Sequence, residues 1–149
     1  MWDLPYPLSP EVIAWFSWHN GADMSVPPTE WRGLPFGQPL SLAGALESRK
    51  VRLQVGTQLD ASVFEPQFLP IVSESQWGLV LDLTGDVRTP VLEWDLLARD
   101  VATQRTESLS QFVTLIGDAL DAGLWFIDGA GDWAVADRGN DARFDWFAE

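Results

Sequence analysis

Residues 70–95, PIVSESQWGLVLDLTGDVRTPVLEWD, form the stretch that decides the fold of this chain of 149 residues. Two runs within it, 76–82 and 90–95, are rich in apolar and aromatic side chains, and the turn-forming sequence TGD lies between them. Apolar runs on either side of a glycine-containing turn predict a β-hairpin. We therefore expect an antiparallel pair of strands at the centre of the fold.

A third strand is expected at residues 68–72, FLPIV, directly before the hairpin. Its Pro70 favours the edge of the sheet or an irregular strand start, because proline has no N–H to donate to a neighbouring strand. Three adjacent antiparallel strands make an independently stable sheet when another element covers one face. The rest of the chain should therefore supply that cover.

The first covering element is a predicted helix that begins after Ser9. Serine is a favoured N-cap, and Pro10 fits the first helical position, where its missing N–H costs nothing. Apolar residues follow at helical spacing and form one face of this helix: Val12, Trp15 and Phe16. The helix should end at residues 19–21, HNG, because asparagine and glycine accept the left-handed conformation of a helix C-terminus.

Two further helices are predicted, over residues 41–53 and 109–122. The second has a wide apolar stripe, is capped by Ser108 and ends at Gly123. Two short strands are expected near the C-terminus, on either side of a turn: residues 124–127 and 133–135, with the turn at 128–132. Connections without regular structure are expected over three segments: residues 22–40, 54–67 and 96–108.

Length and composition agree with one α+β domain over residues 1–149, built on a mostly antiparallel sheet flanked by helices. A chain of this length buries roughly two-thirds of the surface that it exposes when unfolded, and 46% of its residues are hydrophobic. The absence of cysteine fits a reducing compartment. The sequence shows no leader-like segment and no apolar run of transmembrane length, so a soluble cytoplasmic protein is expected.

The chain is strongly acidic, with 22 acidic residues against nine basic ones and a formal net charge of −13. Such a chain repels nucleic acids and anionic membranes and attracts basic proteins. Solubility alone is the other explanation of this charge. Residues 118–149 carry eight acidic and two basic residues, so the negative charge is concentrated toward the C-terminus.

Carboxylates in and beside the hairpin are candidates for chemistry: Asp82, Asp86, Glu93 and Asp95. Paired carboxylates hydrolyse glycosides or hold a divalent cation. Because side chains alternate along a strand, Glu93 and Asp95 should share one face of the sheet. A polar, solvated face is the preferred interpretation of these residues.

Neither a metal site nor a cofactor site is predicted. Asp128, Asp132 and Asp137 lie in a glycine-rich context, but they lack the spacing and the terminal glutamate of an EF-hand loop. The single histidine, His19, lies beside a predicted helix C-terminus, where the helix dipole stabilises a partly charged imidazole. A catalytic triad would need this histidine, and the sequence has no G-x-S-x-G nucleophile motif.

The segment 128–149 combines acidic and aromatic residues, a composition typical of a protein-binding hot spot. We therefore predict a partner-binding site there, extended by one residue of the hairpin turn. Its members are Asp128, Asp132, Trp133, Asp137, Trp146 and Asp86. The other explanation is a C-terminal tail that folds back on the domain.

A series of motifs follows the chain: WHNGA at 18–22, LPFG at 34–37, SLAGAL at 41–46, FLPIV at 68–72, WGLVLDL at 77–83, TPVLEWD at 89–95 and SLSQFVTLIGDALDAGLW at 108–125. In this order and spacing they resemble the SMI1/KNR4 family, also called the SUKH superfamily, over about residues 8–127. The resemblance implies a single α+β domain with a non-enzymatic binding role, and it implies no catalytic residue. Asn20, Gly21 and Asp82 match positions of the family pattern, whereas residues 128–149 match none.

Bacterial members of this family look like immunity proteins of polymorphic toxin systems, and fungal members are cell-wall regulators that act through protein contacts. The favoured hypothesis is accordingly an immunity protein that neutralises a basic toxin, such as a nuclease, by stoichiometric binding. A regulatory adaptor of the same type without a toxin partner is one alternative. A small metal-dependent hydrolase that uses the hairpin carboxylates is the other.

Overall fold

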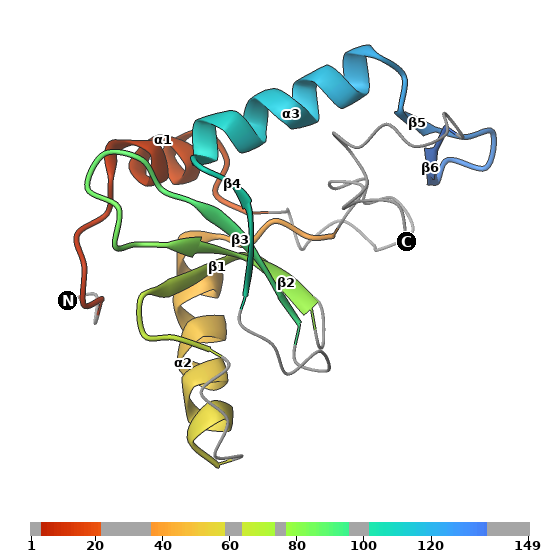
Figure 1. Ribbon diagram of the computed structural model, residues 1–149. Helices are drawn as coiled ribbons and strands as arrows, with labels where there is room; N and C mark the ends of the chain where they lie inside the picture. The colour runs from red at the N-terminus through yellow and green to blue at the C-terminus, as the bar shows by residue number, and fades with distance from the viewer. Residues whose placement is uncertain (1–3, 22–36, 59–63, 74–76, 96–101, 137–149) are drawn as a thin grey trace.

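The computed structural model describes residues 4–21, 37–58, 64–73, 77–95 and 102–136. In these ranges the chain has an α+β fold in which helices flank an antiparallel sheet (Figure 1), as the sequence predicts. The elements are α1 (Pro10–Trp18), α2 (Leu42–Gln58), β1 (Phe68–Ser73), β2 (Trp77–Asp82), β3 (Val91–Asp95), β4 (Thr103–Thr106), α3 (Leu109–Asp121), β5 (Trp125–Ile127) and β6 (Trp133–Val135). The larger sheet has the order β1-β2-β3-β4, and β5 pairs with β6 in a second sheet.

The predicted hairpin forms the middle of the larger sheet, where β2 and β3 pair antiparallel. The turn that follows β2 is organised by Asp82. Its Oδ1 accepts hydrogen bonds from the backbone N–H of Thr84 at 2.9 Å and from the Thr84 hydroxyl at 2.7 Å. An aspartate that binds the backbone two residues ahead favours a turn, so the chain reversal is specified locally.

The prediction for Pro70 is confirmed as well. β1 lies at an edge of the larger sheet, and its pairing with β2 is irregular between Pro70 and Val72. On the outer side of β1, Val72 forms a β-bridge with Pro39, and the N–H of Leu40 donates to the carbonyl oxygen of Ile71 at 2.8 Å. The segment before α2 therefore covers part of this edge, which limits pairing with other chains.

The interpretation of residues 96–108 as a connection is wrong for residues 103–106, because they form β4 and pair with β3. Thr103 and Gln104 are exposed, and Thr106 is the buried residue of the strand. The segment thus lacks the apolar alternation by which strands are recognised in a sequence. It is a strand because the outer edge of β3 presents backbone groups that need hydrogen-bond partners.

Helix α1 begins and ends as predicted. Ser9 Oγ accepts a hydrogen bond from the N–H of Val12 at 3.4 Å, Pro10 lies in the first turn, and the three residues of the predicted apolar face are buried. Beyond the helix, Gly21 has a φ of 86°. A Cβ at this position would lie 2.5 Å from the backbone nitrogen of Ser41, so conformation and space both require glycine.

Helix α2 extends beyond residue 53, where the prediction ends it. Its start is held by two side chains. Asn20 Oδ1 accepts a hydrogen bond from the N–H of Leu42 at 2.9 Å, and Ser41 Oγ accepts one from the N–H of Gly44 at 3.0 Å. Residues 54–58, QVGTQ, contain no proline, so each added residue gains a backbone hydrogen bond although no apolar pattern marks the extension.

Helix α3 covers the same side of the sheet as α1 (Figure 1). Ser108 Oγ accepts a hydrogen bond from the N–H of Gln111 at 3.0 Å, and Gly123, with a φ of 66°, follows the end of the helix as predicted. The main hydrophobic core lies between these helices and the sheet. A second cluster comes from strand residues on the alternate face and from the segment before β1: Phe64, Phe68, Val80, Leu92 and Trp94.

The short hairpin of β5 and β6 is confirmed at the C-terminal end of the described chain, with the turn 128–132 between its strands. The predictions for residues 22–36, and those for Asp137 and Trp146, lie outside the described residues. Among the helices of the described ranges, none combines the length and the apolar character needed to cross a bilayer.

Candidate functional site

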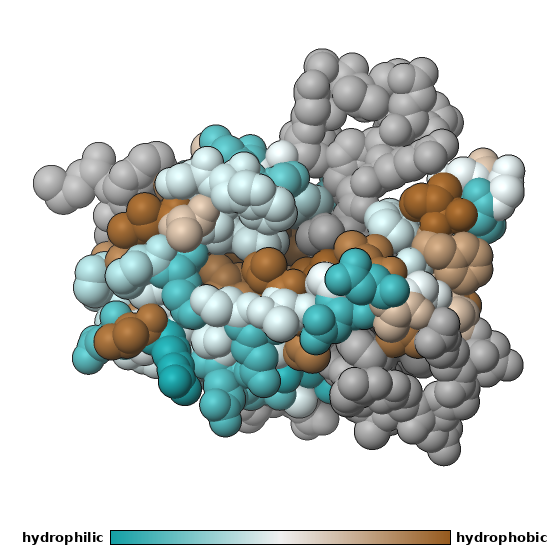
Figure 2. Space-filling model, turned by 90° about the horizontal axis from the view of Figure 1, so that it is seen from above, coloured by the Kyte–Doolittle hydropathy of each residue, from teal (hydrophilic) through white to brown (hydrophobic). Residues whose placement is uncertain are grey.

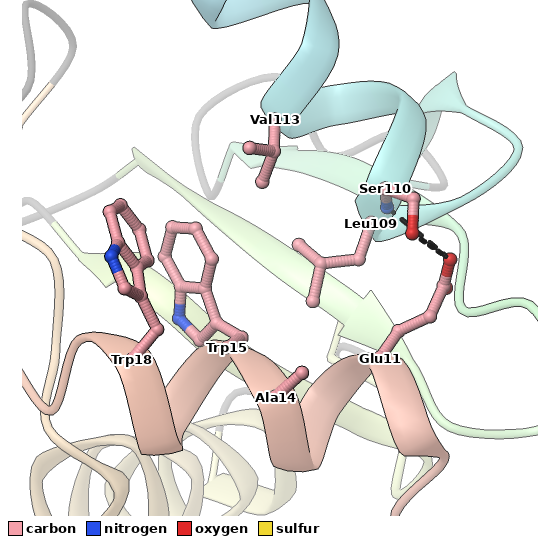
Figure 3. Close-up of a pocket in the computed structure, with 7 residues that line it drawn as sticks. All are labelled: Glu11, Ala14, Trp15, Trp18, Leu109, Ser110 and Val113. Carbon is pink, nitrogen blue, oxygen red and sulfur yellow. Dashed lines mark hydrogen bonds between the residues drawn. The ribbon is translucent and has the colours of Figure 1, made fainter.

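A groove of about 320 Å³ lies between α1 and α3 (Figure 3). The α1 residues that line it follow the spacing i, i+3, i+4 and i+7, which places them on one face of the helix. The α3 residues come from its first two turns. The lining residues are Glu11, Ala14, Trp15 and Trp18 on α1, and Leu109, Ser110 and Val113 on α3.

The groove has a buried floor and exposed walls. Trp15 and Leu109 form the floor and are 5% and 2% exposed, whereas Trp18 is 73% exposed and Val113 is 40% exposed. The two helices are joined at the Glu11 end and separate toward Trp18 and Val113 (Figure 3). Large apolar side chains left in solvent beside a cavity are typical of interaction sites.

Glu11 closes one end of the groove and joins three parts of the chain. Its carboxylate accepts hydrogen bonds from the N–H of Thr89 at 2.9 Å, from the Ser110 hydroxyl at 2.5 Å and from the Ser110 N–H at 3.3 Å. Burial by itself would raise the pKa of Glu11, but these hydrogen bonds to the charged form outweigh it and the pKa lies below its ordinary value. Glu11 is therefore an anionic connector of α1, α3 and the β2–β3 loop.

An aromatic cluster lies at the open end of the groove. The Trp15 and Trp18 rings meet edge to face at 5.9 Å between centroids, and the rings of Trp18 and His19 lie 5.5 Å apart. In the part of the chain that the structure describes, Trp15 Nε1 and His19 Nδ1 are the buried side-chain polar atoms without a hydrogen-bond partner. Buried polar atoms usually have a partner, so these two atoms are exceptions within the described residues.

The helices that form the groove are acidic. α1 contains Glu11, α3 contains Asp118 and Asp121, and neither helix contains lysine or arginine. Arg88 of the β2–β3 loop lies 4.0 Å from Glu107, which precedes α3, and both side chains are largely exposed. The electrostatic environment of the groove therefore favours cationic over anionic partners.

The structure gives Asp128 a local role in the turn between β5 and β6. Its Oδ1 accepts hydrogen bonds from the backbone N–H of Ala130 at 2.8 Å and of Asp132 at 3.0 Å. The backbone hydrogen bond from Asp132, supported by those from Ala130 and Gly131, holds the pKa of Asp128 below its ordinary value. The side chain of Asp132 itself is exposed.

The predicted partner-binding residues do not all lie on one surface. Trp133 is half-buried and packs against the main core, and Asp86 is exposed on the β2–β3 loop. This loop lies near α1, whereas β5 and β6 lie at the opposite end of α3 (Figure 1). Asp86 is thus separated from Asp128 and Asp132, and a binding role for any of the predicted residues stays a prediction.

Two of the four hairpin carboxylates, Glu93 and Asp82, make hydrogen bonds within the larger sheet and its turn. Glu93 accepts hydrogen bonds from Trp77 Nε1 at 2.8 Å and from Arg105 Nε at 2.6 Å, and Asp82 binds the turn that follows β2. Within the described residues, no group of three or more His, Cys, Asp or Glu side chains is placed to hold a metal ion. These carboxylates therefore stabilise strand pairing and a turn.

The sequence pattern does not predict the groove as a site. The wide apolar stripe that is predicted for α3 includes Val113 and Leu120, which are 40% and 41% exposed. A stripe wider than the contact that one neighbouring element covers is a signal of such a surface. Trp18, which directly precedes the predicted helix end at residues 19–21, carries no comparable local signal.

Comparisons with known proteins add no relative to these observations: the chain matches no protein-family model, and no curated protein matches its sequence.

Proposed function

We propose that this protein is a non-enzymatic, protein-binding domain that neutralises a basic toxin by stoichiometric binding, in the manner of an immunity protein. The observation that carries the proposal is the groove between α1 and α3. It combines a highly exposed Trp18, an apolar floor and two helices without a basic residue. Aromatic anchors in a desolvated pocket are the usual energetic centre of a protein interface.

The charge of the chain supports the choice of a basic partner. A net charge of −13 accelerates the encounter with a cationic protein, such as a nuclease whose substrate-binding surface is basic. Apolar anchors in the groove then slow dissociation, since differences in affinity arise mostly from the dissociation rate. Neutralisation follows when the bound protein covers the active site of the toxin or holds it in a closed state.

The resemblance of the motif order to the SMI1/KNR4 family supports the same function. Two of the matching residues have structural roles in this chain: Gly21 adopts a positive φ, and Asn20 caps α2. Conformational and capping roles at motif positions are compatible with a family of binding domains that shares a fold rather than a catalytic site.

Inhibition of a co-encoded toxin tests the proposal. A gene for an immunity protein lies beside the gene for its toxin, so the product of the neighbouring gene is the toxin whose activity is measured. Toxin activity should fall linearly with added protein and reach its minimum at an equimolar ratio. A toxin that stays fully active at that ratio contradicts the proposal for that pair, and a non-toxic binding partner identifies a regulatory adaptor instead.

The hydrolase alternative is tested with the protein alone. Assays with nuclease, glycosidase and esterase substrates, in the presence of Mg²⁺ or Mn²⁺, should give no turnover. Turnover that Asp82→Asn abolishes while the thermal unfolding transition is retained would replace the binding proposal by an enzymatic one.

A further inference from the structure

The apolar surface of the groove continues along α3. Val113, Gly117 and Leu120 have the spacing i, i+4 and i+7 and therefore share one face of the helix. Seen from above, apolar side chains run across the middle of this side of the molecule, between more polar bands (Figure 2). We call this apolar face of α3, from Leu109 to Leu120, the track; it is roughly 16 Å long at 1.5 Å per residue.

Gly117 is the unusual member of the track. Glycine in the middle of a helix is destabilising relative to alanine. A Cβ at Gly117 would meet no atom of the described residues within 4 Å, so packing within this part of the chain does not require glycine there. A missing side chain on an exposed helix face lets a second backbone approach closely, as small residues do where two helices pack together.

The groove has room for large apolar side chains from outside. Its volume is about 320 Å³, and a cavity of about 150 Å³ holds one benzene ring. Two rings or branched aliphatic side chains therefore fit between the Trp15–Leu109 floor and the walls formed by Trp18 and Val113.

The charges beside the track select the partner. Asp121 follows Gly117 by four residues, so it lies on the same side of α3, and Asp118 is exposed next to it. A second copy of this chain would bring the same net charge of −13 to the interface and would be repelled. A partner segment with lysine or arginine next to its apolar anchors matches both the apolar track and the acidic side chains of Asp118 and Asp121.

We propose that the groove and the track along α3 together receive one amphipathic helix of a basic partner protein. The large apolar side chains of this helix enter the groove, its backbone crosses α3 at Gly117, and its basic side chains face Asp118 and Asp121. Anchors at i, i+3, i+4 and i+7 are how amphipathic helices fill apolar grooves. The inference rests on the proposed protein-binding function and names the segment of the partner that docks.

Binding of synthetic peptides to the full chain tests the inference. The probe is a fluorescein-labelled amphipathic helix of about 15 residues with leucine at i, i+4, i+7 and i+11 and with lysine and arginine beside the leucines. One matched peptide carries glutamate at every basic position, and another has the same composition with the leucines scrambled. Fluorescence anisotropy should show that both matched peptides bind at least about tenfold more weakly than the probe.

Variants of the protein locate the binding site. Trp18→Ala and Gly117→Gln should each weaken binding of the basic peptide about tenfold or more, because one removes an exposed anchor and the other fills the crossing point. Ile13→Ala is the matched control, since Ile13 is 54% exposed on a different face of α1. Thermal unfolding of each variant checks that the fold is retained.

Three outcomes overturn the inference: equal binding of the glutamate peptide, binding that Trp18→Ala and Gly117→Gln leave unchanged, and a dimer of this chain that Trp18→Ala dissociates. The toxin assay separates this inference from the proposed function. Equal neutralisation by the wild type and by Gly117→Gln would leave the function intact and remove the docking mode. Peptide binding at the groove without toxin inhibition would support the docking mode and contradict the immunity role.

Discussion

At the scale of single residues, Gly21 follows the end of α1 and packs against Ser41, the residue before α2. With a φ of 86° and a Cβ position 2.5 Å from the backbone nitrogen of Ser41, it tolerates no side chain. We expect Gly21→Ala to lower the free energy of unfolding by about 2 kcal/mol or more. Gly129→Ala is the control, because among the residues that the structure describes a Cβ at Gly129 meets no atom within 4 Å. Urea unfolding measures both, and equal effects would contradict the steric argument.

The carboxylate of Glu11 makes stability depend on pH. Its pKa lies below the ordinary value of 4.5, so its stabilising effect is present above about that pH and is lost as the pH falls through the lowered pKa. At pH 7, Glu11→Gln should cost about 1 kcal/mol, a figure reduced for the partial exposure of the group. The difference from the wild type should shrink below pH 4.5. Thermal unfolding of both proteins between pH 7 and a pH below 4.5 measures this, and a difference that does not change with pH would contradict the role of the charged carboxylate.

At the scale of the secondary-structure elements, Gly117 makes α3 less stable than a helix with alanine at this position. Gly117→Ala should raise the free energy of unfolding by about 0.5–1 kcal/mol, because alanine favours the helix and no atom of the described ranges lies within 4 Å of the new Cβ. The same substitution at Gly44 of α2 places a Cβ 3.2 Å from Ser41 Oγ, which caps that helix, so the gain should be smaller or absent. Circular dichroism melting compares the two, and a destabilised Gly117→Ala would show that α3 needs glycine for its own packing.

At the scale of the whole molecule, the net charge of −13 should control how fast a basic partner is captured. Raising the salt concentration from about 0.05 to about 0.5 M should slow association about tenfold while changing dissociation little, because exposed charges are screened over shorter distances. Trp18→Ala should instead accelerate dissociation, and the association rate of this variant should depend on salt as it does for the wild type. Stopped-flow binding of the basic peptide measures both rates. A salt-independent association rate would remove steering from the mechanism.

The sequence by itself determined the features that depend on neighbours along the chain. Ser9 and Ser108 cap their helices, Gly21 and Gly123 follow helix ends, and the central hairpin pairs as expected. These features depend on side chain to backbone hydrogen bonds and on φ preferences within a few residues, so they can be predicted without the tertiary structure.

Only the tertiary structure decided which surfaces stay open. β4 is a strand because β3 presents an edge to it, and Trp133 is half-buried because the core reaches β6. Trp15 and Trp18 are one turn apart on the same helix, yet one is 5% exposed and the other 73% exposed. Spacing places side chains on a face, but the position of α3 decides how much of that face is covered. The groove is therefore a property of how α1 and α3 pack, which residue order alone does not specify.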